Sequence, residues 1–439
     1  MKITFVGAGS SVFARNVLGD CMLTPSLRES EMALYDIDGQ RLEDSYLILE
    51  AMNNTVNEGR AHLTKHLGVP NRKAALKDAD FVVTAIQVAL YDPGTIIDFE
   101  VPKKFGLRQT IGDTLGIGGI FRALRTIPVF ADIARDMEEV APRARMLNYV
   151  NPMAMITGYM QRYTNVPTVG LCHSVQSCTS CLLKDLGMED KLEGRRELIA
   201  GINHMGWLLE IEDKDGNDLY PEIRRRAAEK NAAEQHGDMV RYEYIKHLGY
   251  YCTESSEHNA EYNNLFIKSK YPELIERFNI PLDEYLRRCV SNIEGWQAEK
   301  AAILKDARRG HTRSGEYGSY IMDAVVNNAP YKIGGNVLNT GLIDNLPADA
   351  CVEVPCLVDG KFVNPCHVGR LPVQLAGMNM TNINVQLATI EAAHTLKREH
   401  IYHAAMLDPH TSSELSIDEI VKMCDALIEA HGDYLPKYH

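Results

Sequence analysis

The sequence predicts an α/β fold, with a Rossmann-like doubly wound parallel sheet in residues 1–170 and a mixed α+β domain in residues 171–439. Short apolar runs alternate with amphipathic stretches through the first part of the chain, the order that builds a parallel sheet. A glycine turn directly follows the first apolar run, as in sheets that bind nucleotides. A chain of 439 residues also exceeds one ordinary core, so at least two domains are expected.

The first 36 residues have the order strand, glycine turn, helix, strand and acid. The two strands and the helix are expected at residues 2–6, 32–35 and 10–21. This order is typical of a unit that binds a dinucleotide, although similar glycine turns also join ordinary strands and helices. This glycine turn follows the first strand of the chain, and an acid lies at about the expected spacing after it. Both observations favour dinucleotide binding over an ordinary turn.

Five positions in this unit bear on how it would hold a nucleotide. Gly7 permits the sharp turn, and Gly9 lets the backbone approach a pyrophosphate, whose charge the N–H groups from Ser10 onward would hold. Asp36 is placed to accept hydrogen bonds from the adenosine ribose. Its charge also repels a 2′-phosphate, which favours NAD over NADP. The third glycine of the fingerprint is missing, because Val12 occupies that position.

Composition and charge narrow the classes of function. Hydrophobic residues make up 45% and charged residues 24%, as in globular proteins. A net charge of −13 argues against nucleic acid or an anionic membrane as a partner. No apolar run is long enough to span a membrane, and no signal peptide precedes the first strand, so we expect a cytoplasmic protein. Ten cysteines without a disulfide-framework spacing agree with a reducing compartment.

The alternation of strands and helices continues to residue 170. Strands are expected at residues 62–66, 81–84, 145–149 and 166–171, and helices at residues 41–57 and 71–78. Residues 85–119 form a long glycine-rich loop after a sheet strand, which is more often functional than idle. A helix over residues 120–140 follows, and Pro128 is expected to kink or divide it. In the second domain we expect a hairpin over residues 352–363 and helices over residues 385–405 and 416–430.

Polar residues follow two of the expected strands at the edge where such sheets bind ligands. Asn151 comes after one strand, and Cys172 and His173 come after the next. Cys172 and His204 together offer a thiolate and an imidazole, which suit a divalent transition metal. Two protein ligands are too few for a structural zinc site, so substrate or water would complete the shell. From spacing alone, a buried cysteine and a core histidine are the commoner alternative.

Other residues could supply acid–base chemistry. His173 could act as an acid or base near neutral pH, or be an ordinary surface histidine. Asp113 lies in the glycine-rich loop, where it could equally cap the next helix. Residues 249–262 are dense in Tyr, Glu, Ser and His, which suits a site for hydroxyl groups or a plain solvated loop.

Seven segments together resemble glycoside hydrolase family four, and within it the α-galactosidases. They are residues 3–10, 110–119, 146–154, 170–176, 201–205, 253–258 and 342–347. The similarity covers nearly the whole chain, and the order of the segments makes it strong although no single one is decisive. It implies a fold similar overall to lactate and malate dehydrogenases, with residues 171–439 as the catalytic domain.

This resemblance implies a hydrolase that uses redox chemistry internally, unlike glycosidases with two catalytic carboxylates. NAD oxidises the sugar hydroxyl at C3, which acidifies the proton at C2, and a divalent metal, commonly Mn²⁺, stabilises the resulting enediolate. A base removes the C2 proton, the glycosidic bond breaks by elimination, and water adds. Hydride return then regenerates NAD.

The resemblance also implies roles for individual residues. The metal ligands of the family fall on Cys172 and His204, and the Asn that contacts sugar falls on Asn151. His173 stands where some phospho-α-glucosidases have an aspartic proton donor, so an imidazolium would serve here. Asp113 falls in the loop where relatives place a carboxylate that supports the base.

The base itself is a tyrosine in phosphoglycosidase relatives, and it falls within residues 250–262. We choose Glu257 as the catalytic base, with Tyr251, His258 and Tyr262 as alternatives.

The leading hypothesis is therefore an NAD-dependent hydrolase of small α-galactosides such as melibiose, with Mn²⁺ or another divalent transition metal, and a homodimer or homotetramer as in relatives. An α-glucosidase or α-uronidase of the same family is the nearest alternative, because pocket shape sets sugar choice. The first 170 residues alone also suit an NAD-dependent 2-hydroxy-acid dehydrogenase, although its Arg-x-x-x-Asp and Gly-x-x-His pattern is not evident. A nucleotide sensor without enzymatic activity would not need the metal pair.

Overall fold

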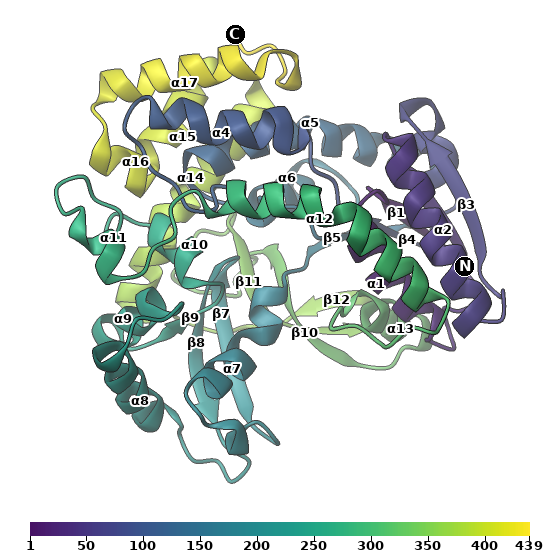
Figure 1. Cartoon of the computed structure of the whole chain (residues 1–439), viewed down its shortest axis with the longest axis horizontal. Coiled ribbons are helices and arrows are strands. Elements are labelled where there is room, and N and C mark those ends of the chain that lie inside the picture. Colours follow the sequence, from purple (N-terminus) through teal and green to yellow (C-terminus); the bar gives the residue numbers. More distant parts are fainter.

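Twelve strands form one continuous sheet in the computed structural model, which describes residues 1–439 (Figure 1). Their order is β3-β2-β1-β4-β5-β6-β10-β11-β7-β8-β9, and β12 pairs with β11. Strands β1 to β6 pair in parallel, whereas all the later pairs are antiparallel. The predicted doubly wound parallel sheet followed by a mixed α+β region is therefore confirmed.

The parallel part alternates strand and helix. Its strands are β1 Lys2–Val6, β2 Glu31–Asp36, β3 His62–Leu67, β4 Phe81–Thr84, β5 Arg145–Asn148 and β6 Thr168–Gly170. Its helices are α1 Ser11–Met22, α2 Gly39–Val56, α3 Arg72–Leu76, α4 Ile96–Lys103, α5 Gly116–Val140 and α6 Met153–Tyr163. The central strands β1 and β4 are buried almost throughout, because helices cover both faces of a parallel sheet.

The antiparallel part begins with a hairpin and ends with four helices. Its strands are β7 Arg196–Ile202, β8 Met205–Glu212, β9 Tyr251–Cys252, β10 Tyr331–Leu338, β11 Cys351–Asp359 and β12 Phe362–Pro365. Its helices are α7 His173–Asp185, α8 Tyr220–Ala233, α9 Met239–Leu248, α10 Ser256–Glu261, α11 Glu273–Arg277, α12 Glu284–Ala307, α13 Gly318–Asn327, α14 Val373–Thr395, α15 Arg398–Leu407, α16 Pro409–Glu414 and α17 Ile417–His431. The hairpin expected over residues 352–363 is confirmed as β11 and β12.

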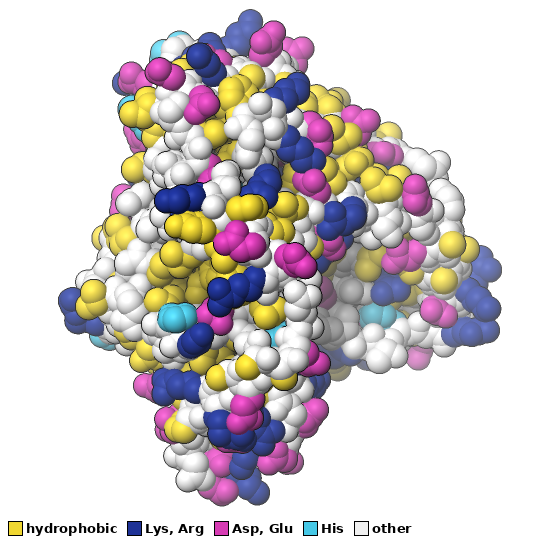
Figure 2. All heavy atoms as spheres, turned by 60° about the vertical axis from the view of Figure 1, so that its left-hand side comes forward, with side chains coloured by type: hydrophobic (Ala, Val, Ile, Leu, Met, Phe, Trp, Pro, Cys, Tyr) yellow, Lys and Arg dark blue, Asp and Glu magenta, His cyan; other side chains and the backbone are white.

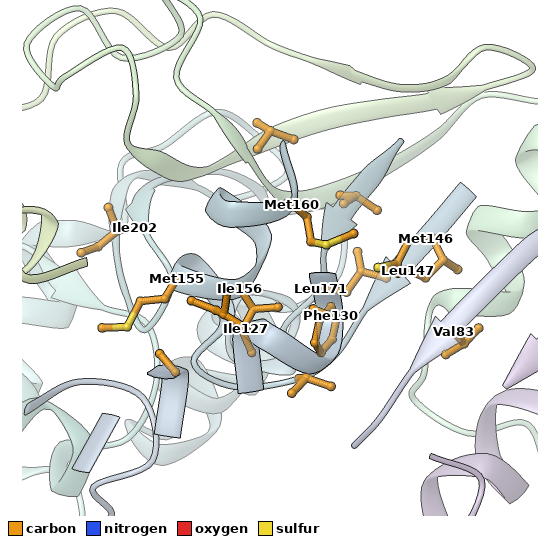
Figure 3. Close-up of a cluster of buried hydrophobic side chains, with 14 of the residues drawn as sticks. Val83, Ile127, Phe130, Met146, Leu147, Met155, Ile156, Met160, Leu171 and Ile202 are labelled. Atoms are coloured by element: carbon orange, nitrogen blue, oxygen red, sulfur yellow. The ribbon is translucent and has the colours of Figure 1, made fainter. Parts of the chain in front are cut away.

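One hydrophobic core of 96 buried residues extends through both parts of the sheet. Figure 3 shows a portion of it, where Phe130 of α5 and Met160 of α6 lie close to Leu147 of β5 and to Leu171. A second core of 16 residues lies among α7, α8, α9 and the β7–β8 hairpin. Whether residues 1–170 fold as a separate domain stays a prediction.

Three expected elements differ from the structure. Residues 85–119 are not one loop, because a π-helical turn at Leu90–Thr95 and helix α4 occupy its first half. Helix α5 runs unbroken through Pro128, where packing against α14 and α6 outweighs one lost backbone hydrogen bond. The helix expected over residues 385–405 is two helices, α14 and α15, because Leu396 adopts a left-handed conformation with φ 57°.

None of the helices has both the length and the apolar character that crossing a membrane requires. On the face shown in Figure 2, basic and acidic side chains are interspersed, and hydrophobic side chains gather around a hollow near the middle. The C-terminal helices (yellow in Figure 1) lie beside α4 and α5, although α4 and α5 belong to the first half of the chain.

Candidate active site

One cavity of about 1050 Å³ joins the first glycine turn to the carboxyl ends of β5 and β6. Parallel sheets of this type bind ligands at that edge. Most of the predicted site residues contribute to its wall. They are Gly7, Gly9, Ser10 and Asp36 at one end and Asp113, Asn151, Cys172 and His173 at the other. A cavity of this size holds a dinucleotide more readily than a single small metabolite.

The glycine turn is stabilised by Asp36 at the end of β2 as well as by its own backbone conformation. Gly7 has φ +91°, and a Cβ at this position would overlap the carbonyl group of Ala85. The Asp36 carboxylate accepts hydrogen bonds from the backbone N–H of Gly9 at 2.6 Å and of Asp38 at 2.9 Å. Asp36 therefore shapes the turn in addition to facing the cavity.

Three side chains near the other end form a cluster able to hold a metal ion. The ligand atoms of Cys172, His204 and Glu254 all lie within 4.8 Å of one another. Cys172 follows β6, His204 lies in the turn between β7 and β8, and Glu254 follows β9. A thiolate, an imidazole and a carboxylate suit a catalytic divalent transition metal, because three protein ligands leave positions for substrate or water.

Backbone strain marks the same cluster. His204 and Glu254 have φ values of 63° and 65°, in the left-handed region that residues other than glycine rarely adopt. Such conformations persist where the surrounding structure holds them, most often at functional sites. The backbone at both candidate ligands is therefore held in a conformation of higher local energy.

The charges within the cluster balance one another. Burial alone would lower the pKa of His204, but Glu254, Cys172 and Asp113 outweigh it and raise the pKa to about 10. Burial would also raise the pKa of Glu254, but His204 and His258 hold it below its usual range. The metal-free cluster therefore carries a proton on His204, and a bound cation would take the place of that proton.

Tyr262, one of the alternatives for the catalytic base, contacts the imidazole ring of His204. The Tyr262 hydroxyl is fully buried and lies 2.9 Å from His204 Nδ1. The other ring nitrogen, Nε2, lies 3.3 Å from Glu254 Oε2. A hydrogen bond at one nitrogen orients the ring and leaves the second nitrogen free for a metal, the usual arrangement around ligating histidines.

Asp113 and His258 face each other beside this cluster. His258 Nε2 lies 3.7 Å from Asp113 Oδ1, and His258 Nδ1 lies 2.7 Å from Ser255 Oγ. Burial alone would raise the pKa of Asp113, but His258 and Arg122 hold it well below its usual range. Asp113 is therefore ionised at neutral pH and can stabilise a positive charge on His258.

The loop that carries Asp113 is held by a buried carboxylate. Glu261 accepts hydrogen bonds from the backbone N–H groups of Thr110, Ile111 and Gly112, at 2.8, 3.2 and 2.8 Å. Three such bonds fix the backbone immediately before Asp113.

The structure does not bring Glu257 or Tyr251 to this cluster. Glu257 forms an ion pair with Arg288 of α12. The Tyr251 hydroxyl donates to Asp238 at 2.6 Å within the smaller core.

Sequence reasoning missed four residues at the site. They are Glu254, Arg122, Tyr285 and Glu316, which contact predicted residues or line the cavity. The Arg122 guanidinium donates to the backbone oxygen of Asn151 at 3.2 Å and to the Tyr285 hydroxyl at 3.4 Å. Of these four, only Glu254 could have been identified from the sequence, because it belongs to the polar segment over residues 249–262.

Comparison with known proteins gives matches over nearly the whole chain. The models described as Family 4 glycosyl hydrolase and Family 4 glycosyl hydrolase C-terminal domain match residues 2–188 and 199–411. An α-galactosidase of Bacillus subtilis (strain 168) is 60% identical over 437 residues, which cover 100% of this chain and 99% of that protein.

Solved structures agree with the fold. LplD of Bacillus subtilis, described as a glucosidase, has a TM-score of 0.84 and 26% identity, covering 97% of this chain and 99% of that one. A 6-phospho-α-glucosidase from gut microorganisms, solved with NAD and Mn²⁺, has a TM-score of 0.78 and 19% identity, covering 100% and 99%. The second likeness concerns the fold alone.

Proposed function

This chain belongs to glycoside hydrolase family 4, and we propose that it hydrolyses α-galactosides with the help of NAD and a divalent metal ion. The observation that carries the proposal is the single cavity that joins the glycine turn to Cys172 and Asp113. A glycosidase with two catalytic carboxylates has no use for a dinucleotide site. The 60% identity to an α-galactosidase over the full length supports galactose as the sugar.

NAD and Mn²⁺ both fit the residues present. The Asp36 carboxylate at the cavity wall disfavours the extra phosphate of NADP. Cys172, His204 and Glu254 offer sulfur, nitrogen and oxygen donors to a divalent transition metal. When bound, the nicotinamide supplies a hydride acceptor, and the cation supplies positive charge beside the sugar oxygens.

We assign removal of the C2 proton to His258, supported by Asp113. His258 Nε2 faces the ionised Asp113 carboxylate, which lines the cavity. Glu257, the base predicted from the sequence, forms an ion pair with Arg288 instead. Tyr262 already contacts the ring of His204. An imidazole that accepts a proton at Nε2 would be stabilised by Asp113 at once.

We assign protonation of the leaving group to His173 and binding of the sugar to Asn151. Both line the cavity beside Cys172. His173 Nε2 lies 2.6 Å from Glu316 Oε2, and this hydrogen bond is the main cause that raises the pKa of His173. A protonated imidazole can donate to the departing glycosidic oxygen.

We also propose that the protein works as a homodimer or homotetramer in a reducing compartment such as the cytoplasm. Helix α12 leaves Val290 and Ile293 exposed, at 38% and 55%. All ten cysteines are free thiols, which a reducing compartment would preserve. Light scattering of the purified protein would test the oligomeric state.

The activity is tested with a panel of nitrophenyl α- and β-glycosides in reducing buffer, with and without NAD and Mn²⁺. We expect cleavage of the α-galactoside that needs NAD in catalytic amounts and produces no net NADH. Net NADH formation with lactate or malate would favour the 2-hydroxy-acid dehydrogenase instead. Full α-galactosidase activity in protein stripped of NAD would refute the proposed mechanism.

A further inference from the structure

One row of paired residues crosses the sheet between the strands that carry the metal cluster. Gly170 of β6 pairs with Asn336 of β10, and Asn336 pairs with Glu353 of β11. Glu353 in turn pairs with Gly201 of β7, and Gly201 with Gly206 of β8. The row therefore spans five neighbouring strands in register.

Each of the three candidate metal ligands lies next to this row. Cys172 closely follows Gly170, and His204 lies in the turn between Gly201 and Gly206. The row reaches Glu254 through its neighbour Thr253, which exchanges two hydrogen bonds with Gly206. The Gly206 N–H donates to Thr253 Oγ1 at 2.9 Å, and the Thr253 N–H donates to the Gly206 oxygen at 2.7 Å. The row thus connects three chain segments that are far apart in sequence.

Two polar side chains join the strands in the middle of the row. Asn336 Nδ2 donates to Glu353 Oε1 at 2.9 Å and to the Gly170 oxygen at 3.3 Å. Both side chains belong to fully buried residues. Burial raises the pKa of the Glu353 carboxyl to about 7, against the opposing influences of Asn336 and of the charge on His204. A buried carboxyl is costly, and an apolar residue of similar size would often be more stable.

The glycines of the row make room for these two side chains. A Cβ on Gly170 would lie 2.9 Å from the Cβ of Asn336, and a Cβ on Gly206 would lie 3.1 Å from Glu353 Oε2. The Glu353 carboxyl is therefore in close contact with β8, immediately after the turn that holds His204. Two glycines of the row thus leave space for two buried polar side chains, which indicates that the polar pair does more than fill the core.

We propose that Asn336 and Glu353 form a buried crosslink that sets the spacing of Cys172, His204 and Glu254, and that Glu353 is a positioning residue of the metal centre. The inference rests on the proposed metal binding, which it deepens. Outer groups that orient metal ligands typically change metal affinity about 10- to 100-fold when removed. The crosslink acts through hydrogen bonding and shape, so a neutral amide at position 353 should preserve it.

The test uses variants that keep the packing volume. Glu353→Met and Asn336→Leu remove the crosslink with apolar side chains of similar size, whereas Glu353→Gln retains an oxygen that accepts from Asn336. The dissociation constant of Mn²⁺ is measured by calorimetry on the full-length protein without NAD, in reducing buffer. We expect about 10- to 100-fold weaker binding in the first two variants and nearly wild-type binding in Glu353→Gln.

Asp408→Asn is the matched control for loss of a buried carboxyl. Asp408 is fully buried and caps α16, so its loss should lower stability without changing the Mn²⁺ affinity. Wild-type affinity in folded Glu353→Met would overturn the proposal. So would equal weakening in Asp408→Asn, since the effect would then follow general stability.

A second measurement separates this inference from the proposed function. Hydrogen exchange of the backbone amides of Met205 and Gly206 reports the β7–β8 turn in the metal-free protein. Exchange there should become faster in Glu353→Met but not in Glu353→Gln, while the amides of α17 are unchanged. If the wild type binds no divalent metal, the proposed metal dependence fails. Unchanged exchange at the turn in Glu353→Met would refute the crosslink itself.

Discussion

His173 and Glu316 form a hydrogen-bonded pair, with Nε2 2.6 Å from Oε2, although 143 positions separate them in the chain. The segment that carries Glu316 is anchored to α1. Asp20 of that helix accepts hydrogen bonds from the backbone N–H of Ser314 at 2.9 Å and from its hydroxyl at 2.6 Å. The helix that follows the nucleotide turn therefore also supports the side chain assigned to the leaving group.

Glu316→Gln should shift the pH dependence of hydrolysis. The hydrogen bond to Glu316 raises the pKa of His173, so the protonated acid persists to higher pH and is lost as pH rises through that value. Removing the carboxylate should move the alkaline limb of kcat/KM for melibiose to lower pH. A dinitrophenyl α-galactoside, whose leaving group needs little protonation, should show a much smaller change. Identical alkaline limbs in variant and wild type with melibiose would count against the role of this pair.

Cys172→Ser should remove most of the metal affinity while the fold is kept. We expect Mn²⁺ to bind more than about 100-fold more weakly, beyond the range typical of changes outside the ligand shell. Cys181→Ser, an exposed cysteine of the adjacent helix α7, is the matched control and should bind Mn²⁺ normally. Metal content of the dialysed proteins measures the difference. A Cys172→Ser protein that retains its metal would show that this thiol is not a ligand.

Gly9→Ala should weaken NAD binding. A Cβ on Gly9 would lie 2.8 Å from Asp36 Oδ2, so the carboxylate would have to leave the turn that it holds. Gly377→Ala is the control, because nothing lies within 4 Å of a Cβ there and the position is within α14. That control should gain about 0.5–1 kcal/mol of stability and bind NAD as the wild type does. Equal NAD affinity in Gly9→Ala would contradict the placement of the dinucleotide.

Local patterns in the sequence were sufficient for the nucleotide unit and for much of the sheet edge. The order from Lys2 to Asp36 depends on neighbours within a few residues, so β1, α1 and β2 follow from periodicity and turn chemistry. Asn151 and Cys172 were predictable as cavity residues because each follows a recognisable parallel strand.

The other site residues depend on contacts between distant segments. Glu254 reaches Cys172 only because β9 pairs with β8, and β9 has just two residues. Glu316 reaches His173 through a loop held by α1, which no local pattern records. The break between α14 and α15 occurs at Leu396 without a glycine or proline to signal it. The continuity of α5 at Pro128 likewise reflects packing that propensity cannot foresee.

Hydrolysis in heavy water reports whether the glycosidic bond breaks after His258, supported by Asp113, removes the proton at C2. The enzyme supplied with NAD and Mn²⁺ cleaves melibiose in D₂O, and proton NMR of the released galactose reports the hydrogen at C2. We predict deuterium at C2, because His258, beside Asp113 of the cavity wall, exchanges its proton with solvent, and we predict that His258→Asn loses incorporation and hydrolysis together. Galactose released with its original hydrogen at C2 would contradict proton removal by a base that exchanges with solvent.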